Sequence, residues 1–154
     1  MKKVICLALS LLLLFPAAQA ANAPITRAAF VALLWQEQGS PSAVSRPFQD
    51  TADTAVSWAY ESGLTHGTSS ETFTPERPIT REEAAVLLRR YDAMRGIDVT
   101  FPLGPSQCNG NEGISPWADD SLYWACETGR IPWRNCQHAP QEPLSAPDLA
   151  AIFP

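Results

Sequence analysis

The sequence predicts an all-α protein built from repeated helical units, and two recurring phrases support that prediction. Ile-Thr-Arg at residues 25–27 returns at residues 79–81, and a weaker copy, Leu-Ser-Ala, follows at residues 144–146. Each copy opens a run of apolar residues at the spacing that lines one face of a helix. A second phrase, Trp-Ala-x-Glu-x-Gly, occupies residues 58–63 and again residues 124–129. Recurrence on this scale is typical of an array of helical units.

Residues 1–20 have the features of a secretory signal peptide. Two lysines precede an apolar run from Val4 to Pro16, and Ala-Gln-Ala stands directly before Ala21. The run is shorter than the roughly 20 residues that a membrane-spanning helix needs. We therefore expect a secreted protein whose mature chain begins at Ala21, with no membrane insertion after signal removal.

The composition of the mature chain limits its partners. Both lysines of the sequence lie in the predicted signal peptide, which leaves nine arginines against 16 acidic residues and a formal charge of −7. A protein with this balance has no broad basic surface for phosphate backbones. The sequence therefore argues against nucleic acid as a partner, although local arginine sites can still hold anions.

Three of the predicted helices begin at Thr26, Thr80 and Ser145. Glu83 follows Thr80 at the spacing of a capping box, in which each side chain accepts a hydrogen bond from a backbone N–H of the other residue. Ser145 and Asp148 repeat that arrangement, whereas the helix after Thr26 has alanine at the acid position. The apolar residues behind these caps are Phe30, Leu33 and Leu34, then Ala84, Leu87, Leu88 and Tyr91, and finally Leu149, Ile152 and Phe153.

Two further helices are predicted around Trp58 and Trp124. Each tryptophan stands beside alanine in an amphipathic pattern, so we interpret both as core anchors rather than platforms for sugar rings. Asp50 and Asp119 precede these helices and are expected in turns or caps, without a catalytic role.

Five landmarks between residues 48 and 91 follow one another in a specific order. They read Phe48-Gln49-Asp50, Trp58-Ala59, Gly63 to Gly67, Phe73-Thr74-Pro75 and Ile79-Thr80-Arg81-Glu82-Glu83. This order resembles the S-layer homology (SLH) family, in which a Phe-x-Asp turn, a Trp-Ala helix, a Gly-rich loop and a Thr-Arg helix succeed one another. The resemblance implies helix-loop-helix repeats packed around a shared core with pseudo-threefold symmetry.

The resemblance also divides the chain. A partial unit at 21–47 keeps only the Thr-Arg helix, a complete unit spans 48–95, a connector rich in Gly, Pro and Asn covers 96–116, and a divergent unit closes the chain at 117–154. The third unit is incomplete, because only two Trp-Ala helices accompany three Thr-Arg-type helices. The last predicted helix has about two turns, so it must lean on the others. We expect the resulting seam to be closed by a second copy of the chain or by another SLH protein.

A ligand is also implied by the resemblance. SLH modules are understood to bind acidic, often pyruvylated, cell-wall polysaccharide, with the arginine of the Thr-Arg motif at the acidic group. On that basis the expected ligand-binding residues are Thr26, Arg27, Gly67, Thr80, Arg81 and Glu83.

The positions of Arg27 and Arg81 give this expectation a physical argument. Both stand at the first helical position, where the positive end of the helix dipole disfavours a cation by about 0.3–1 kcal/mol. A carboxylate docked there would meet free backbone N–H groups together with a planar guanidinium. The alternative is that each arginine pairs with a nearby Asp or Glu. Gly67 likewise either lets backbone approach a ligand or only turns the chain.

Cys108, Cys126 and Cys136 remain after signal removal, and an exported chain meets conditions in which a disulfide persists. We predict one internal disulfide among them, with the pair left open. Together with His66 and His138 these cysteines lack the paired Cys-x-x-Cys spacing of zinc sites, so no metal is expected.

The sequence contains no nucleophile elbow, phosphate loop or zinc-protease motif, and no matched acid and base stand out. We therefore expect no catalytic residue and no cofactor, and predict a non-catalytic anchor at the cell wall or S-layer. One open alternative is a secreted protein-interaction or envelope structural module that binds no glycan. The other is a hydrolase of wall polymer, which would need two carboxylates facing a cleft.

Overall fold

A computed structural model describes residues 24–100 and 113–154, apart from the side chain of Asp119. The predicted signal peptide and Cys108 lie outside the described residues. The described chain forms five helices and no strand, so the all-α prediction is confirmed. The helices are α2 (Arg27–Glu37), α3 (Thr54–Glu61), α4 (Arg81–Met94), α5 (Asp119–Glu127) and α6 (Ala146–Ile152).

The predicted helix starts are found with their caps. The hydroxyl of Thr80 accepts from the backbone N–H of Glu83 while the Glu83 carboxylate accepts from Thr80, so the capping box is complete. Ser145 and Asp148 form the second box at the start of α6. Thr26 caps α2 through its hydroxyl alone. Each start has the extended backbone at the cap that this role requires.

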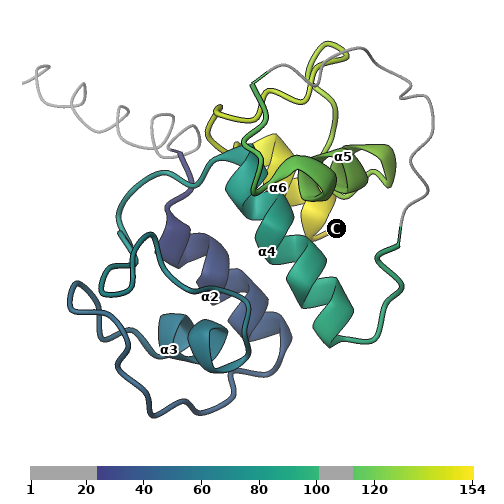
Figure 1. Ribbon diagram of the computed structural model, residues 1–154. Coiled ribbons are helices and arrows are strands. Elements are labelled where there is room, and N and C mark those ends of the chain that lie inside the picture. The colour runs from purple at the N-terminus through teal and green to yellow at the C-terminus, as the bar shows by residue number, and fades with distance from the viewer. Residues whose placement is uncertain (1–23, 101–112) are drawn as a thin grey trace, which may run out of the picture.

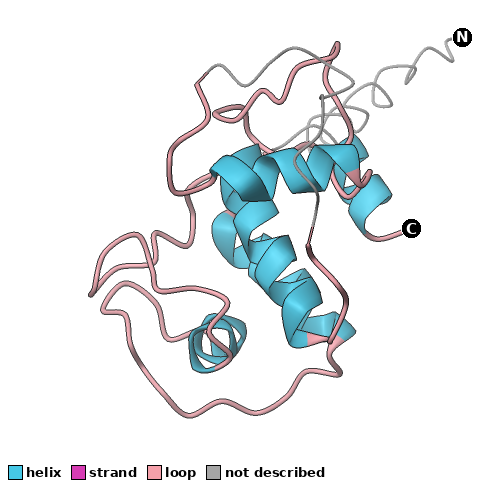
Figure 2. Cartoon of the chain, turned by 45° about the vertical axis from the view of Figure 1, so that its right-hand side comes forward, coloured by secondary structure: helices cyan, strands magenta, loops and turns pink. Residues whose placement is uncertain are grey.

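Helix α4 occupies the middle of the molecule (Figure 1). Helices α2 and α3 lie on one side of it and α5 and α6 on the other, with α3 packed on α2 and α5 packed on α4. Long loops connect the helices (Figure 2). The segments that lead into α2, α4 and α6 are far apart in sequence, but they are joined in this arrangement by backbone hydrogen bonds.

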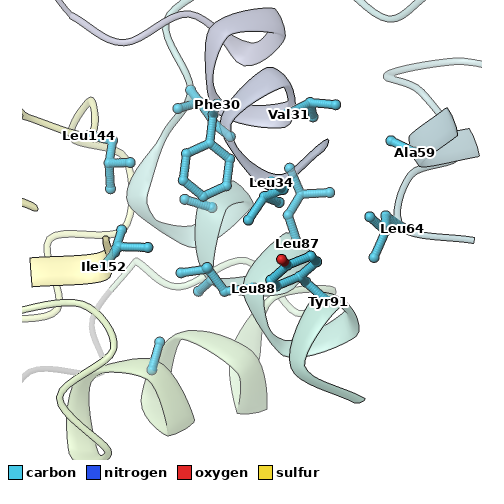
Figure 3. Packing of buried hydrophobic residues seen from close by; sticks show 14 of the residues in the cluster. Phe30, Val31, Leu34, Ala59, Leu64, Leu87, Leu88, Tyr91, Leu144 and Ile152 are labelled. Carbon is cyan, nitrogen blue, oxygen red and sulfur yellow. The ribbon is translucent and has the colours of Figure 1, made fainter. Parts of the chain in front are cut away.

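The hydrophobic core gathers side chains from all five helices (Figure 3). Trp58 and Trp124 are only 6% and 3% exposed, so their interpretation as core anchors is confirmed. Each buried aromatic or aliphatic side chain of this kind stabilises the fold by about 1.5–3 kcal/mol. The fully buried apolar residues are Phe30, Val31, Leu34, Ala59, Phe73, Ile79, Ala84, Ala85, Leu88, Tyr91, Leu122, Ala125, Ile131 and Leu144.

The short helix α6 leans on this core, as its length required. Ile152 is buried, and the ring of Phe153 meets that of Phe30 on α2 edge to face, 6.2 Å between centroids. The outward residues of α6 are alanines and one proline, at 146, 147, 150 and 151. The exposed side of α6 therefore presents small side chains. Closure by a second copy or another SLH protein stays a prediction, as do the unit boundaries and the threefold packing.

The two described cysteines differ in their bonding. Cys136 is disulfide-bonded, whereas Cys126 carries a free, buried thiol, which excludes a bond between these two. Burial raises the pKa of the Cys126 thiol to about 11.

Within 24–100 and 113–154, none of the helices has the length and apolar character needed to span a bilayer.

Candidate anion-binding pocket

The starts of successive Thr-Arg-type helices are joined by backbone hydrogen bonds. The N–H of Ile79, before α4, donates to the carbonyl of Ile25, before α2, at 2.9 Å. The N–H of Leu144, before α6, donates in turn to the carbonyl of Ile79 at 2.9 Å. The recurring phrases at 25–27, 79–81 and 144–146 therefore lie side by side in space.

The backbone N–H groups at these helix starts are already used. In α2, Arg27 donates its N–H to the Arg77 carbonyl at 2.9 Å, and Ala28 donates to Pro75. In α4, the N–H groups of Arg81 and Glu82 donate to carbonyls at Glu142 and Pro140, at 2.9 and 3.2 Å. The expectation that an anion would meet free N–H groups at these helix starts is therefore wrong, because a following loop supplies the acceptors.

Arg81 is fully buried, and its guanidinium is held inside the protein. Its Nη1 pairs with Oδ1 of Asp148 at 2.8 Å, with side-chain exposures of 0% and 3%. Its Nε donates to the His138 carbonyl at 2.8 Å, and its Nη2 donates to Pro132 at 2.6 Å. The internal ion pair raised as the alternative is thus what the structure has at Arg81, and this side chain does not reach the pocket described below.

Asp148 has to balance more than one arginine. Besides Arg81 it contacts Nη2 of Arg134, and it closes the capping box with Ser145. Burial alone would disfavour the ionised carboxylate, but the hydrogen bonds from Ser145 and Arg134 and the Arg81 charge outweigh it. They hold the pKa of Asp148 below its usual range.

Arg27 repeats the same scheme at the start of α2. Its Nη1 pairs with Oε1 of Glu83 at 2.9 Å, and its Nε donates to the Phe73 carbonyl at 2.9 Å. The guanidinium also lies over the Phe73 ring, 4.7 Å from the centroid. Burial lowers the pKa of Arg27 against the opposing effect of Glu83. Unlike Arg81, however, Arg27 borders an open hollow.

That hollow is a pocket of about 460 Å³ between α4, the start of α2 and the loop after α3. Three arginines and one carboxylate face it, so the pocket carries positive charge in a chain that is acidic overall. Its lining residues are Arg27, Thr65, His66, Gly67, Thr68, Arg77, Glu83, Val86, Leu87, Arg90 and Trp117.

Glu83 ties the arginines of this pocket to the fold. It accepts from Arg27, from Arg77 and from the backbone of Thr80. Burial opposes its ionisation, but these hydrogen bonds and charges prevail and hold its pKa below the usual range. Glu83 therefore stays a carboxylate, and by itself it cannot neutralise three guanidinium groups.

The wall formed by the loop after α3 depends on Gly67. Its φ is +86°, and a Cβ placed there would lie 2.5 Å from the Phe48 ring and from the Ser69 carbonyl oxygen. The need to turn the chain where no side chain fits is enough to explain a glycine at this position. Asp50 braces the next stretch by accepting from the backbone N–H groups of Phe73 and Thr74, at 2.9 and 2.7 Å. Those bonds lower the pKa of Asp50.

The structure brings three of the six predicted ligand residues to the pocket: Arg27, Gly67 and Glu83. Thr26, Thr80 and Arg81 instead form the helix starts behind it. Arg77, Arg90 and Trp117 were not predicted. For Arg90 a signal existed, because residues 83, 86, 87 and 90 fall at the spacing of one helix face. No sequence signal brings Trp117 to this site, because it lies beyond the connector.

No cluster of three or more His, Cys, Asp or Glu side chains suited to a metal ion occurs in the part of the chain that the structure describes. The pocket lining offers guanidinium donors, hydroxyls and an aromatic ring. Groups of these kinds are suited to binding and orienting a ligand, and a carboxylate or phosphate is the partner that planar guanidinium groups fit best.

Sequence comparisons relate part of this chain to known proteins. The family model described as "S-layer homology domain" matches residues 49–85, which cover α3, the loop after it and the first turn of α4. A relative, an endoglucanase from Bacillus sp. (strain KSM-635), is 31% identical over 106 residues, which is 66% of this chain and 11% of the endoglucanase. The chain thus spans about a tenth of that relative. Residues 49–85 of this protein therefore match the S-layer homology family in sequence.

Proposed function

We propose that this protein is a non-catalytic cell-envelope anchor that binds acidic cell-wall polysaccharide in the pocket between α2 and α4. The match of residues 49–85 to the S-layer homology domain supports association with the cell surface or S-layer. Such domains are anchoring modules rather than enzymes. The endoglucanase match supports no hydrolytic activity here, because it takes up only 11% of that enzyme.

The observation that carries the proposal is the convergence of Arg27, Arg77 and Arg90 on one pocket of a chain with net negative charge. An acidic protein excludes polyanions from most of its surface, so a local positive pocket selects where an anion binds. Arg77 and Arg90 are exposed, and Arg27 is fixed by Glu83 and Phe73. Each charge-assisted hydrogen bond to a ligand carboxylate contributes about 1.5–3 kcal/mol.

The two exposed arginines differ in how far they are already paired. Arg77 shares Glu83 with Arg27, whereas Arg90 donates its Nη1 to the Leu64 carbonyl at 2.9 Å and has no carboxylate within ion-pair distance among the described residues. Arg90 is therefore the residue that we expect to bind the acidic group of the ligand. Thr65 and Thr68 add hydroxyls on the facing wall.

The test is sedimentation of the mature protein with purified cell walls, either intact or stripped of acidic polysaccharide. We expect Arg90→Ala and Arg77→Ala each to weaken binding to intact walls by about tenfold. Arg95→Ala is the matched control. Arg95 is an exposed arginine at the end of α4, where its guanidinium stacks on Tyr91, and it does not line the pocket. Arg130 is a poor control because it pairs with the buried Asp92.

Equal losses for Arg90→Ala and Arg95→Ala would reduce the binding to nonspecific charge attraction and contradict the proposal. Undiminished binding to stripped walls would contradict it as well. That second result would favour the alternative of a protein-interaction or structural module that binds no glycan.

A further inference from the structure

Trp117 is the exception among the five tryptophans of this chain. It is 58% exposed, whereas Trp58 and Trp124 are buried and Trp35 and Trp133 pack against the core. A fully buried aromatic side chain removes about 150–250 Å² from water, and the exposed part of the Trp117 indole leaves a share of that surface available to a partner. Trp117 also lines the arginine pocket, although it comes from the far side of the connector.

Its counterpart in the repeated pattern behaves differently. Phe48 opens the complete unit where Trp117 opens the divergent one, and Phe48 is 5% exposed. The Phe48 ring packs against Phe73 and Tyr60, with 5.7 Å between centroids in each case. The aromatic residue at this place in the pattern therefore serves the core in one unit and borders the pocket in the other.

We propose that Trp117 is a stacking platform for a sugar ring whose acidic substituent is held by Arg77 and Arg90. This inference rests on the proposed function and deepens it by naming what the ligand must present. A pyranose ring has one face of C–H groups, which pack favourably on an aromatic ring, while its charged group needs guanidinium donors. The pocket joins both requirements within about 460 Å³.

The consequence is a selectivity that the arginines alone would not give. A simple polyanion without sugar rings uses only the guanidinium groups, so its binding is independent of the indole. An acidic polysaccharide gains from both contacts. Trp117 thus distinguishes acidic glycan from other polyanions by the apolar face next to the charge.

The experiment compares Trp117→Ala and Trp117→Phe with the wild-type mature protein, using solubilised acidic wall polysaccharide and poly-glutamate as probes. We expect Trp117→Ala to weaken polysaccharide binding about fivefold to tenfold and to leave poly-glutamate binding unchanged. Trp117→Phe should recover most of the affinity. Ile97→Ala is the matched control, because Ile97 is a 45% exposed apolar residue away from the pocket.

Fluorescence gives a second readout that does not depend on an alanine variant. Because the other tryptophans are shielded, the polysaccharide should shift the emission of the wild type to shorter wavelength and leave the emission of ligand-bound Trp117→Phe nearly unchanged. If binding needs acidic polysaccharide and Arg90 but is equal in wild type and Trp117→Ala, the stacking inference falls while the proposed function stands. If Trp117→Ala weakens both probes alike, the indole is not a sugar platform and the inference is also overturned.

Discussion

Arg81 and Asp148 form an ion pair that is almost completely closed off from water, with 2.8 Å between Nη1 and Oδ1. The same relationship recurs between Arg27 and Glu83 at 2.9 Å. In each case the arginine is the first residue of one Thr-Arg-type helix, and the acid belongs to the capping box of the next such helix. Each capping acid therefore caps its own helix and also forms an ion pair with the first residue of the preceding Thr-Arg-type helix.

Removing Arg81 should destabilise the protein severely. Arg81→Ala removes one of the two arginines that pair with the buried Asp148 and takes a hydrogen-bond donor away from three acceptors, and breaking a buried pair in this way costs about 3–5 kcal/mol. That is a large share of the roughly 5–15 kcal/mol that stabilises a typical domain. Urea unfolding followed by circular dichroism measures the effect.

The control for this prediction is Arg77→Ala. Arg77 also pairs with a capping acid, but its side chain is 42% exposed, so its loss should cost about 1 kcal/mol or less. Similar unfolding midpoints for the two variants would contradict the structural role assigned to Arg81.

Acid should destabilise the fold through Asp148 and Glu83. The pKa of each carboxyl is lower in the folded chain than its ordinary value of 3.8 or 4.5, so the unfolded chain binds protons first. Their contribution is complete above about pH 5 and is lost as the pH falls through the folded-state pKa values. The measurement is the melting temperature between pH 7 and pH 2.5.

In the variant Asp148→Asn one of these titrations is absent. We expect it to melt below the wild type at neutral pH, to depend less on pH below pH 4, and to converge with the wild type at the acid end. Glu76→Gln, at an exposed acid of the loop before α4, should follow the wild-type curve throughout. Parallel curves for wild type and Asp148→Asn would contradict the linkage.

Two glycines of the loop after α3 allow a matched test of the pocket wall. Gly67 and Gly63 both have positive φ, +86° and +73°, but only Gly67 is crowded, with three atoms within 2.6 Å of an added Cβ. Gly63→Ala should cost about 1–2 kcal/mol, the price of the left-handed backbone alone. Gly67→Ala should cost more and should also weaken wall binding, because the loop must move away from the Phe48 ring.

Thermal unfolding and wall sedimentation of both variants provide the comparison. Equal destabilisation by the two substitutions would mean that the loop yields easily around Gly67. Unchanged wall binding by a folded Gly67→Ala variant would separate the loop from the ligand site.

The candidate site was only partly predictable, and the residues show why. Thr80 and Glu83 are three positions apart, so their capping box could be recognised locally. The helical spacing of Glu83, Val86, Leu87 and Arg90 also shows that these four share a face. It does not show that the face borders a cavity, because the opposite wall comes from the loop after α3 and from Trp117.

The sequence alone determined where the helices start, how they are capped and which side chains are apolar, since capping and periodicity act within a few residues of chain. Only the tertiary structure decided the fates of the two motif arginines. Their carboxylate partners lie 56 and 67 residues away, and the carbonyls that fill the helix N–H groups come from equally distant loops. Burial and pairing depend on contacts between distant segments. For that reason Arg81 lies in a buried ion pair, whereas Arg27 borders the pocket.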